Sequence, residues 1–178
     1  YSIKSTYQNY NSPVHQIFLH FKSTYIQKEQ VSPMDTFEVL NNLLVNLFND
    51  ILDIEQKALI TDEFKDISVT DMHIIEAVGI DEPRTMTAIS KLLGVTMGTL
   101  TIGMNGLVKK GYVLRVRSTK DRRIVYASLT EKGLSAYRHH KNFHKSMIES
   151  VMKNLTEEEA SVLTKAFVKL EDFFEQWK

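Results

Sequence analysis

A short basic loop carries the clearest chemistry in this chain. It has the sequence RSTKDRR and lies between two β-branched or alternating runs, Val113–Arg117 and Ile124–Leu129. Two such runs joined by a polar loop predict a β-hairpin. An extended cationic tip can insert into a narrow minor groove, where the negative potential of duplex DNA is strongest. The predicted DNA contacts of the loop are Arg117, Ser118, Lys120, Arg122 and Arg123.

Asp121 lies inside this loop and would repel a phosphate group. Its predicted role is therefore to hold a neighbouring arginine in a fixed rotamer, so that less side-chain entropy is lost on binding. The alternative is that Asp121 serves only as a turn residue.

The helix expected over Thr96–Lys110 separates into two faces at 3.6 residues per turn. The predicted core side holds Met97, Leu100, Met104 and Leu107. The opposite face places Ile102 among glycines, which suits a major groove: Ile102 can contact a thymine methyl and Asn105 can pair with adenine. Gly98 and Gly106 permit close backbone approach, and the helix N-terminus suits phosphate contacts. The predicted DNA contacts are Thr96, Gly98, Thr99, Thr101, Ile102, Asn105 and Lys109.

Shorter helices precede this one. A helix over Ser68–Val78 is ended by Gly79, and a second over Thr85–Leu93 begins at Thr85 as N-cap and is broken by Gly94. Helix, turn, helix and basic hairpin in this order predict a winged helix-turn-helix.

The charge distribution agrees with a polyanion-binding face. The 22 basic and 22 acidic residues balance overall, but residues 34–82 hold 12 Asp/Glu against Lys57 and Lys65. Residues 109–145 hold 11 Lys/Arg against Asp121 and Glu131. A basic block set apart from an acidic one is typical of nucleic-acid binding, although charge alone is equally compatible with a solvated face.

Long amphipathic helices flank this middle part. One apolar stripe follows a 3-4 spacing at Phe37, Leu40, Leu44, Leu47, Ile51, Ile54 and Ala58. A helix from about Thr130 carries Leu134, Tyr137, Ile148, Val151 and Leu155, and a capping box at Thr156–Glu159 opens a last helix with Leu163, Phe167, Leu170, Phe174 and Trp177. Packing against a second copy is the predicted use of these stripes; the alternative is an intramolecular core alone.

The predicted class is mainly α with a small β-hairpin, a winged helix-turn-helix flanked by long dimerisation helices. The predicted domains are a leader or added extension (1–33), an N-terminal dimerisation helix (34–66), a DNA-binding domain (67–130) and C-terminal dimerisation helices (131–178). The chain has no cysteine, which excludes thiol catalysis, disulfides and cysteine zinc sites. It also shows no run of about 20 apolar residues and no signal-peptide core, so a cytoplasmic location is expected.

The segment SKLLGVTMGTLTIGMNGLVKKGYVLRVRSTKDRRIVYASLTEKG resembles the winged helix of the MarR family of bacterial regulators. The DRR tip, the LVKKGYV helix exit and the LTEKG opening of the next helix match the family pattern, and the likeness extends from about Met34 to Lys178. It implies a triangular homodimer whose N- and C-terminal helices form the apex. VTMGTLT, VRSTKDRRIVY and RHHKNFHKSMIE are most similar to the branch that represses fatty-acid-biosynthesis genes. That branch implies long-chain acyl-acyl carrier protein as corepressor.

An acyl-chain site needs an apolar slot, and methionines and aromatic residues adapt to a flexible chain. Its predicted lining is Phe48, Ile51, Leu52, Met72, His73, Phe143 and Met147, each of which could equally be ordinary core. Acyl carrier proteins are acidic, so Arg138, Lys141 and Lys145 are candidate docking residues, unless they reach DNA phosphates.

No metal or other cofactor is expected. His140 and His144 are spaced i, i+4, which can hold a metal, but Lys141 and Lys145 beside them disfavour a cation. No carboxylate pairs with a nucleophile, a phosphate loop or metal-spaced histidines, so an enzyme is not expected. The remaining alternatives are a regulator of the same family that responds to an aromatic compound, a drug or a metal, and a winged helix used for protein docking.

Overall fold

The computed structural model describes residues 33–176. Nearly all of the predicted N-terminal extension and Trp177 of the last apolar stripe lie outside the described residues. The chain divides into two compact units, one ending at Phe143 and the other beginning at His144, so the boundary falls within one helix. Of the helices described, none is long and apolar enough to cross a membrane.

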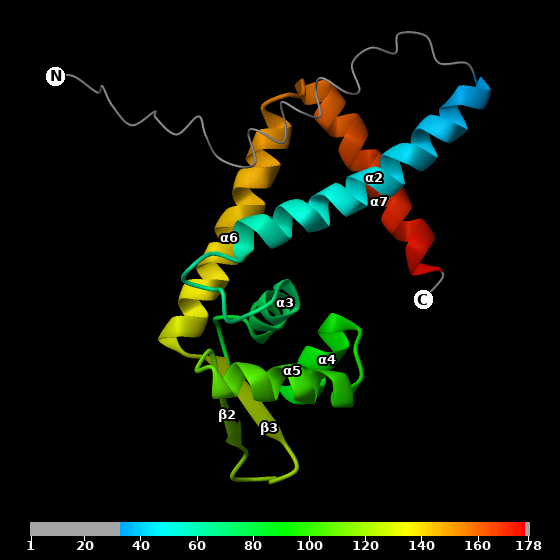
Figure 1. The fold of residues 1–178 in the computed structure, drawn as a ribbon. Helices are drawn as coiled ribbons and strands as arrows, with labels where there is room; N and C mark the ends of the chain where they lie inside the picture. Colours follow the sequence, from blue (N-terminus) through cyan, green and yellow to red (C-terminus); the bar gives the residue numbers. More distant parts are fainter. Residues whose placement is uncertain (1–32, 177–178) are drawn as a thin grey trace, which may run out of the picture. The chain divides into compact units, whose positions relative to one another are not determined.

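The first unit contains the winged helix (Figure 1). Its elements in chain order are α2 (Pro33–Leu59), α3 (Val69–Val78), β1 (Arg84–Thr85), α4 (Met86–Leu93), α5 (Met97–Lys109), β2 (Val113–Arg117), β3 (Val125–Leu129) and the first part of α6 (Glu131–Met152). Helices α3, α4 and α5 pack together, and the β2–β3 hairpin projects beyond them. This confirms the predicted helix-turn-helix followed by a wing.

Side-chain caps fix where the short helices begin. Ser68 and Asp71 form a reciprocal capping box at α3, and the hydroxyls of Thr85 and Thr96 accept hydrogen bonds from the backbone N–H three residues later, at 3.1 Å each. Gly94 ends α4 in the left-handed conformation, with φ of 64°. Because a β-carbon is strained in that conformation, glycine there sets the sharp turn into α5.

The core of this unit lies between α3, α4 and α5. Leu100, Met104 and Leu107 point inward and are buried, which confirms three of the four predicted core positions of α5. Met97 was predicted to be core and is 43% exposed. The prediction was wrong because Met97 is the first residue of α5, where it lines an open cavity instead of the helix packing.

The sheet has the strand order β1-β3-β2 and is antiparallel throughout. Val113 pairs with Leu129 and Arg117 with Val125, which confirms the hairpin. Ile124, predicted to start the second strand, belongs to the turn, since its N–H donates to the carbonyl of Asp121 at 2.9 Å. Two-residue strand β1 was not predicted, because a pair as short as Arg84–Thr85 has no readable period.

A buried tyrosine ties the start of α6 to the loop before α3. The hydroxyl of Tyr112 donates to Asp66 at 2.6 Å, and Lys132 donates to the same carboxylate at 3.0 Å while its ammonium lies 4.0 Å from the centre of the tyrosine ring. These hydrogen bonds, that of Tyr112 first, lower the pKa of Asp66 below its usual value. The carboxylate therefore favours the folded state when it is ionised.

This cluster predicts an acid-dependent stability. A lowered folded-state pKa contributes stability that is present above the unfolded value of about 3.9 and is lost as the pH falls through the folded value. Tyr112→Phe should cost about 1 kcal/mol or less at pH 7, because Asp66 is partly exposed and screened. Urea unfolding at pH 7 and at pH 3 should show the difference from wild type shrinking in acid. A difference that is the same at both pH values would contradict this role.

The second unit consists of α6 from His144 onward and α7 (Glu157–Glu175). Thr156 and Glu159 form the predicted capping box at the start of α7, and the hydrogen bonds from Thr156 lower the pKa of the Glu159 carboxyl. Leu155, expected within the preceding helix, lies in the short connection after α6 ends at Met152.

Candidate nucleic-acid interface

Helix α5 presents the predicted polar and glycine-rich face to solvent. Ile102 is 77% exposed, and Asn105 and Lys109 are exposed beside it. A β-carbon added to Gly106 would meet open space, so the backbone is accessible there. Contact with water does not stabilise an isoleucine side chain exposed in the middle of a helix, whereas contact with a thymine methyl would bury its apolar surface.

The threonines of α5 differ in what they can offer a ligand. Thr96 and Thr99 are exposed at the helix N-terminus, with their hydroxyl oxygens 2.9 Å apart. The free N–H groups of the first turn add to them as a site for a phosphate. Gly98 is exposed between the two. The hydroxyl of Thr101 donates instead to the carbonyl of Met97 at 2.6 Å, so Thr101 retains only acceptor capacity towards DNA.

Asn105 is joined to the hairpin. Its Oδ1 accepts a hydrogen bond from Nη2 of Arg115 at 2.6 Å, which links α5 to β2. The sequence did not indicate this bond, because it depends on how the strand registers against the helix. An amide oxygen has two lone pairs, so Asn105 keeps one acceptor site and both donors for a base edge.

The tip of the wing is held by its own side chains. Ser118 Oγ accepts hydrogen bonds from the backbone N–H groups of Lys120 and Asp121, at 3.2 and 3.3 Å. Asp121 accepts from the backbone N–H of Arg123 at 3.0 Å and from its guanidinium, with Nη2 at 2.9 Å and Nε at 3.1 Å. The guanidinium lowers the pKa of the Asp121 carboxyl, and the carboxylate raises the pKa of Arg123. Asp121 thus makes the ion pair expected of it and also shapes the turn.

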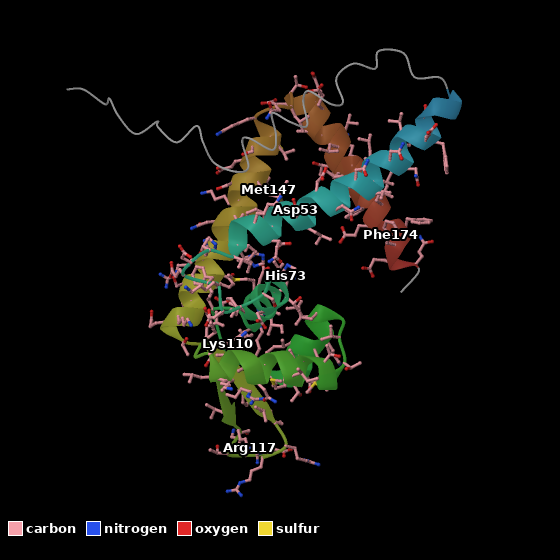
Figure 2. The ribbon with its side chains drawn as sticks, in the orientation of Figure 1. Asp53, His73, Lys110, Arg117, Met147 and Phe174 are labelled. Atoms are coloured by element: carbon pink, nitrogen blue, oxygen red, sulfur yellow. The ribbon has the colours of Figure 1, made fainter. Side chains whose placement is uncertain are left out.

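The cationic side chains of the tip project from the fold. Arg117, Lys120, Arg122 and Arg123 are exposed, and Figure 2 shows Arg117 at the outer end of the hairpin. The other face of β2 is apolar and exposed to solvent, since Leu114 and Val116 are more than half exposed.

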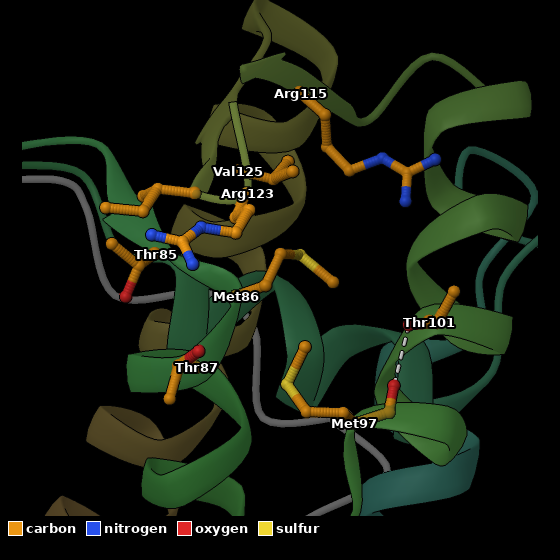
Figure 3. A pocket seen from close by; sticks show the side chains of 9 residues that line it. Thr85, Met86, Thr87, Met97, Thr101, Arg115, Arg123 and Val125 are labelled. Atoms are coloured by element: carbon orange, nitrogen blue, oxygen red, sulfur yellow. Dashed lines mark hydrogen bonds between the residues drawn. The ribbon is translucent and has the colours of Figure 1, made fainter. Parts of the chain in front are cut away.

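A cavity of about 440 Å³ lies between the β2–β3 hairpin and helix α5. Its lining comes from β1, α4, α5, both hairpin strands and the turn between them, and Figure 3 shows Arg115, Arg123, Met86 and Met97 among the side chains around it. Two guanidinium groups thus border the hollow between the two elements predicted to enter adjacent grooves.

This geometry agrees with the known proteins that the chain resembles. Residues 65–124 match the model of the MarR family. The crystal structure of Streptococcus pneumoniae FabT in complex with DNA is similar with 42% identity and a TM-score of 0.76, covering 80% of this chain and 99% of that one. The chain belongs to the MarR family. The uncharacterised HTH-type transcriptional regulator YpoP of Bacillus subtilis is 28% identical over 82% of this chain and 96% of its own length.

A more distant MarR-family structure shows the same fold. A mutant MarR from E. coli complexed with operator DNA has 23% identity and a TM-score of 0.60, covering 79% of this chain and 99% of that one. This likeness shows the shared fold, while the family match and the similarity to FabT and YpoP identify the chain as a MarR-family DNA-binding transcriptional regulator.

The residues predicted to line an apolar slot differ in their burial. Met72 has no exposed surface and is core, and Phe143 is buried, whereas Phe48 and Leu52 are exposed on α2 and Ile51 is half-buried. A residue without accessible surface cannot contact a ligand unless the packing opens. His73 is bonded to the carboxylate of Glu55 at 3.0 Å. Met147, half-buried, belongs to the second unit.

The three residues predicted to dock an acyl carrier protein differ in their exposure and in their ion pairs. Arg138 is exposed, while the ammonium of Lys141 lies 2.7 Å from Glu76, whose carboxylate raises the pKa of Lys141. Lys145 is exposed in the second unit, 3.9 Å from Glu149. Lys141 is therefore the weakest of the three as a free cation for an acidic partner.

Gly106 provides a test that separates folding from DNA binding. Because alanine is favoured over glycine in a helix interior and its methyl would meet open space, Gly106→Ala should raise the free energy of unfolding by about 1 kcal/mol. The same methyl should lower affinity for duplex DNA by holding α5 away from the groove. Urea denaturation and a fluorescence anisotropy titration measure the two effects. Increased stability with unchanged DNA affinity would remove Gly106 from the interface.

Proposed function

We propose that this chain is a homodimeric transcriptional repressor that binds a pseudo-palindromic operator. Each α5 enters a major groove, and each wing enters the flanking minor groove. Two-fold symmetry then places the half-sites about 10 base pairs apart. The observation that carries the proposal is the pairing of an exposed Ile102–Asn105 face with an ordered cationic tip, in a chain 42% identical to a FabT that was crystallised with DNA.

Exposed apolar side chains support the dimer. On α2, Phe37, Leu40, Val45, Phe48 and Leu52 are more than half exposed, and on α7 Val162, Phe167, Val168 and Phe174 are at least half exposed. Apolar stripes of this length mark protein contacts. The proposed occupant is the same pair of helices from a second copy.

We further propose that the regulated genes are those of fatty-acid biosynthesis and that long-chain acyl-acyl carrier protein acts as corepressor, with no enzymatic activity in the chain. The similarity to FabT supports the gene class. Exposed Arg138 and Lys145 suit an acidic carrier protein. The acyl chain would require α2 and α3 to move apart, because Met72 is fully buried.

An operator titration with and without acyl-acyl carrier protein tests the corepressor. A ligand that prefers the DNA-binding state must raise operator affinity, by linkage. We expect long-chain acyl-acyl carrier protein to tighten binding, while carrier protein without an acyl chain has little effect. A fall in operator affinity, or no change in it, would contradict the corepressor proposal. Neither result would bear on the proposal that the chain binds DNA.

A further inference from the structure

The hydrogen bond between Arg115 and Asn105 joins the two elements proposed to contact DNA. Nη2 of Arg115 donates to Oδ1 of Asn105 at 2.6 Å. Arg115 is the central residue of β2 and pairs with Ala127 of β3, so its backbone is fixed by strand pairing before and after it. Figure 3 shows its side chain extending from the strand toward the helix that carries Thr101. The sheet register therefore places this guanidinium against α5.

This hydrogen bond fixes the direction in which the amide of Asn105 faces. A guanidinium has donors only, so the amide turns its oxygen, and not its nitrogen, toward Arg115. Turning the amide over would bring the N–H groups of both residues together and lose the bond. The amide oxygen keeps a second lone pair, and the nitrogen beside it keeps both of its hydrogens. Asn105 thus presents one acceptor and one donor, side by side, to a ligand.

An amide fixed in this orientation matches the major-groove edge of adenine. Adenine alone among the four bases offers a donor, the N6 amino group, next to an acceptor, N7. Guanine offers two acceptors, N7 and O6, so the oxygen of a fixed amide would face an acceptor and be repelled. An amide that is free to rotate can instead point its N–H groups at guanine. Fixing the amide therefore raises the cost of the wrong base, which is a general route to specificity.

Arg115 also keeps its positive charge available to DNA. Among residues 33–176, no carboxylate forms an ion pair with Arg115, whereas Arg123 pairs with Asp121 at 2.9 Å. Only one of the several N–H donors of Arg115 is used by Asn105. The others can contact a phosphate, and such a contact adds affinity for every sequence without reading any. An effect of Arg115 on base preference must therefore pass through Asn105.

We propose that Arg115 is a positioning residue that gives Asn105 its preference for adenine in the operator. The inference rests on the proposed entry of α5 into the major groove, and it adds a residue outside α5 to base recognition. Asn105 touches the base, and Arg115 acts through it by holding Oδ1. The alternative is that Arg115 only fastens β2 to α5, or only adds positive charge.

Binding to single-base variants of one operator tests this role. The operator is selected from random duplex by the full wild-type chain, and each A·T pair is then replaced by G·C in both half-sites. At the pair that Asn105 reads, the replacement should weaken wild-type binding roughly tenfold per half-site, and Asn105→Ala should lose this discrimination. Arg115→Met, which keeps the apolar stem without the donors, should lower it to about threefold. In the Asn105→Ala background, Arg115→Met should change no base preference further.

Arg117→Met is the matched control, because Arg117 lies on the same face of β2, two residues nearer the tip. It should weaken binding to operator and random duplex alike and leave the discrimination at that pair unchanged. Circular dichroism confirms that each variant is folded. Full discrimination in Arg115→Met, or a loss additive with that of Asn105→Ala, would overturn the inference and leave base reading by Asn105 intact. If the wild-type chain selects no sequence, the proposed function fails, and this inference fails with it.

Discussion

Replacing Arg123 by alanine should weaken operator binding by about tenfold per wing, or about 100-fold for a dimer with two wings. A hydrogen bond to a charged group contributes about 1.5 kcal/mol or more, and 1.4 kcal/mol corresponds to a factor of ten. The side chain of Arg123 is 91% exposed, yet its guanidinium is held by Asp121 at 2.9 Å, so little side-chain entropy is lost when it meets DNA. Each lost phosphate contact should also flatten the slope of log affinity against log salt by about 0.9.

A substitution at Asp121 tests whether the fixed conformation of Arg123 contributes to DNA affinity. Asp121→Ala removes a negative charge from a DNA-facing loop, so electrostatics alone predicts tighter binding. Because the variant also frees Arg123 and its backbone N–H, we expect weaker binding instead. Arg122→Ala is the matched control, since it should flatten the salt slope by about one unit per wing in either background. Tighter binding by Asp121→Ala would show that the carboxylate only repels DNA.

Asn105→Ala should reduce sequence preference much more than general DNA affinity. A bidentate asparagine–adenine pair discriminates between bases by about 1–3 kcal/mol, and a dimer has two of them. Competition titrations with operator and random duplex of equal length measure both quantities. Lys109→Ala, one turn further along the same exposed face, should weaken both duplexes equally, because a lysine contact to phosphate reads no sequence.

The effect of Asn105→Ala includes a change at Arg115 that can be measured separately. It donates to Oδ1 of Asn105 at 2.6 Å, so Asn105→Ala also frees Arg115 near the groove. Arg115→Ala leaves Asn105 able to rotate, and the double variant shows whether the two effects are additive. Equal losses on operator and random DNA from Asn105→Ala would contradict base reading by this residue.

The winged helix was predictable because its signals are local. The faces of α5 follow from a 3.6-residue period, and the N-cap at Thr85 follows from a hydrogen bond to the backbone N–H three residues later. The same local logic failed at Met97, since periodicity assigns a side to the first residue of a helix without showing whether anything packs there.

The contacts that the sequence did not reveal join residues far apart in the chain. Glu55 meets His73 and His140 across 18 and 85 positions, and no spacing rule connects an acid on α2 with those imidazoles. In the sequence, Lys141 stands beside His140 and argues against a bound cation there. In the structure, the ammonium of Lys141 pairs with the carboxylate of Glu76 on α3. The apolar slot stays a prediction, because residue types and spacing do not show which side chains the packing buries, as it does Met72.

The claim that α5 and the wing read adjacent grooves of one operator is tested most directly by hydroxyl-radical footprinting. On promoter DNA of fatty-acid-biosynthesis genes, wild type should protect two half-sites about one helical turn apart, together with the minor groove flanking each. The Arg122→Ala, Arg123→Ala double variant should lose only the flanking minor-groove protection, while the central pattern remains at saturating protein. Flanking protection that is absent in wild type, or unchanged in the double variant, would contradict the account.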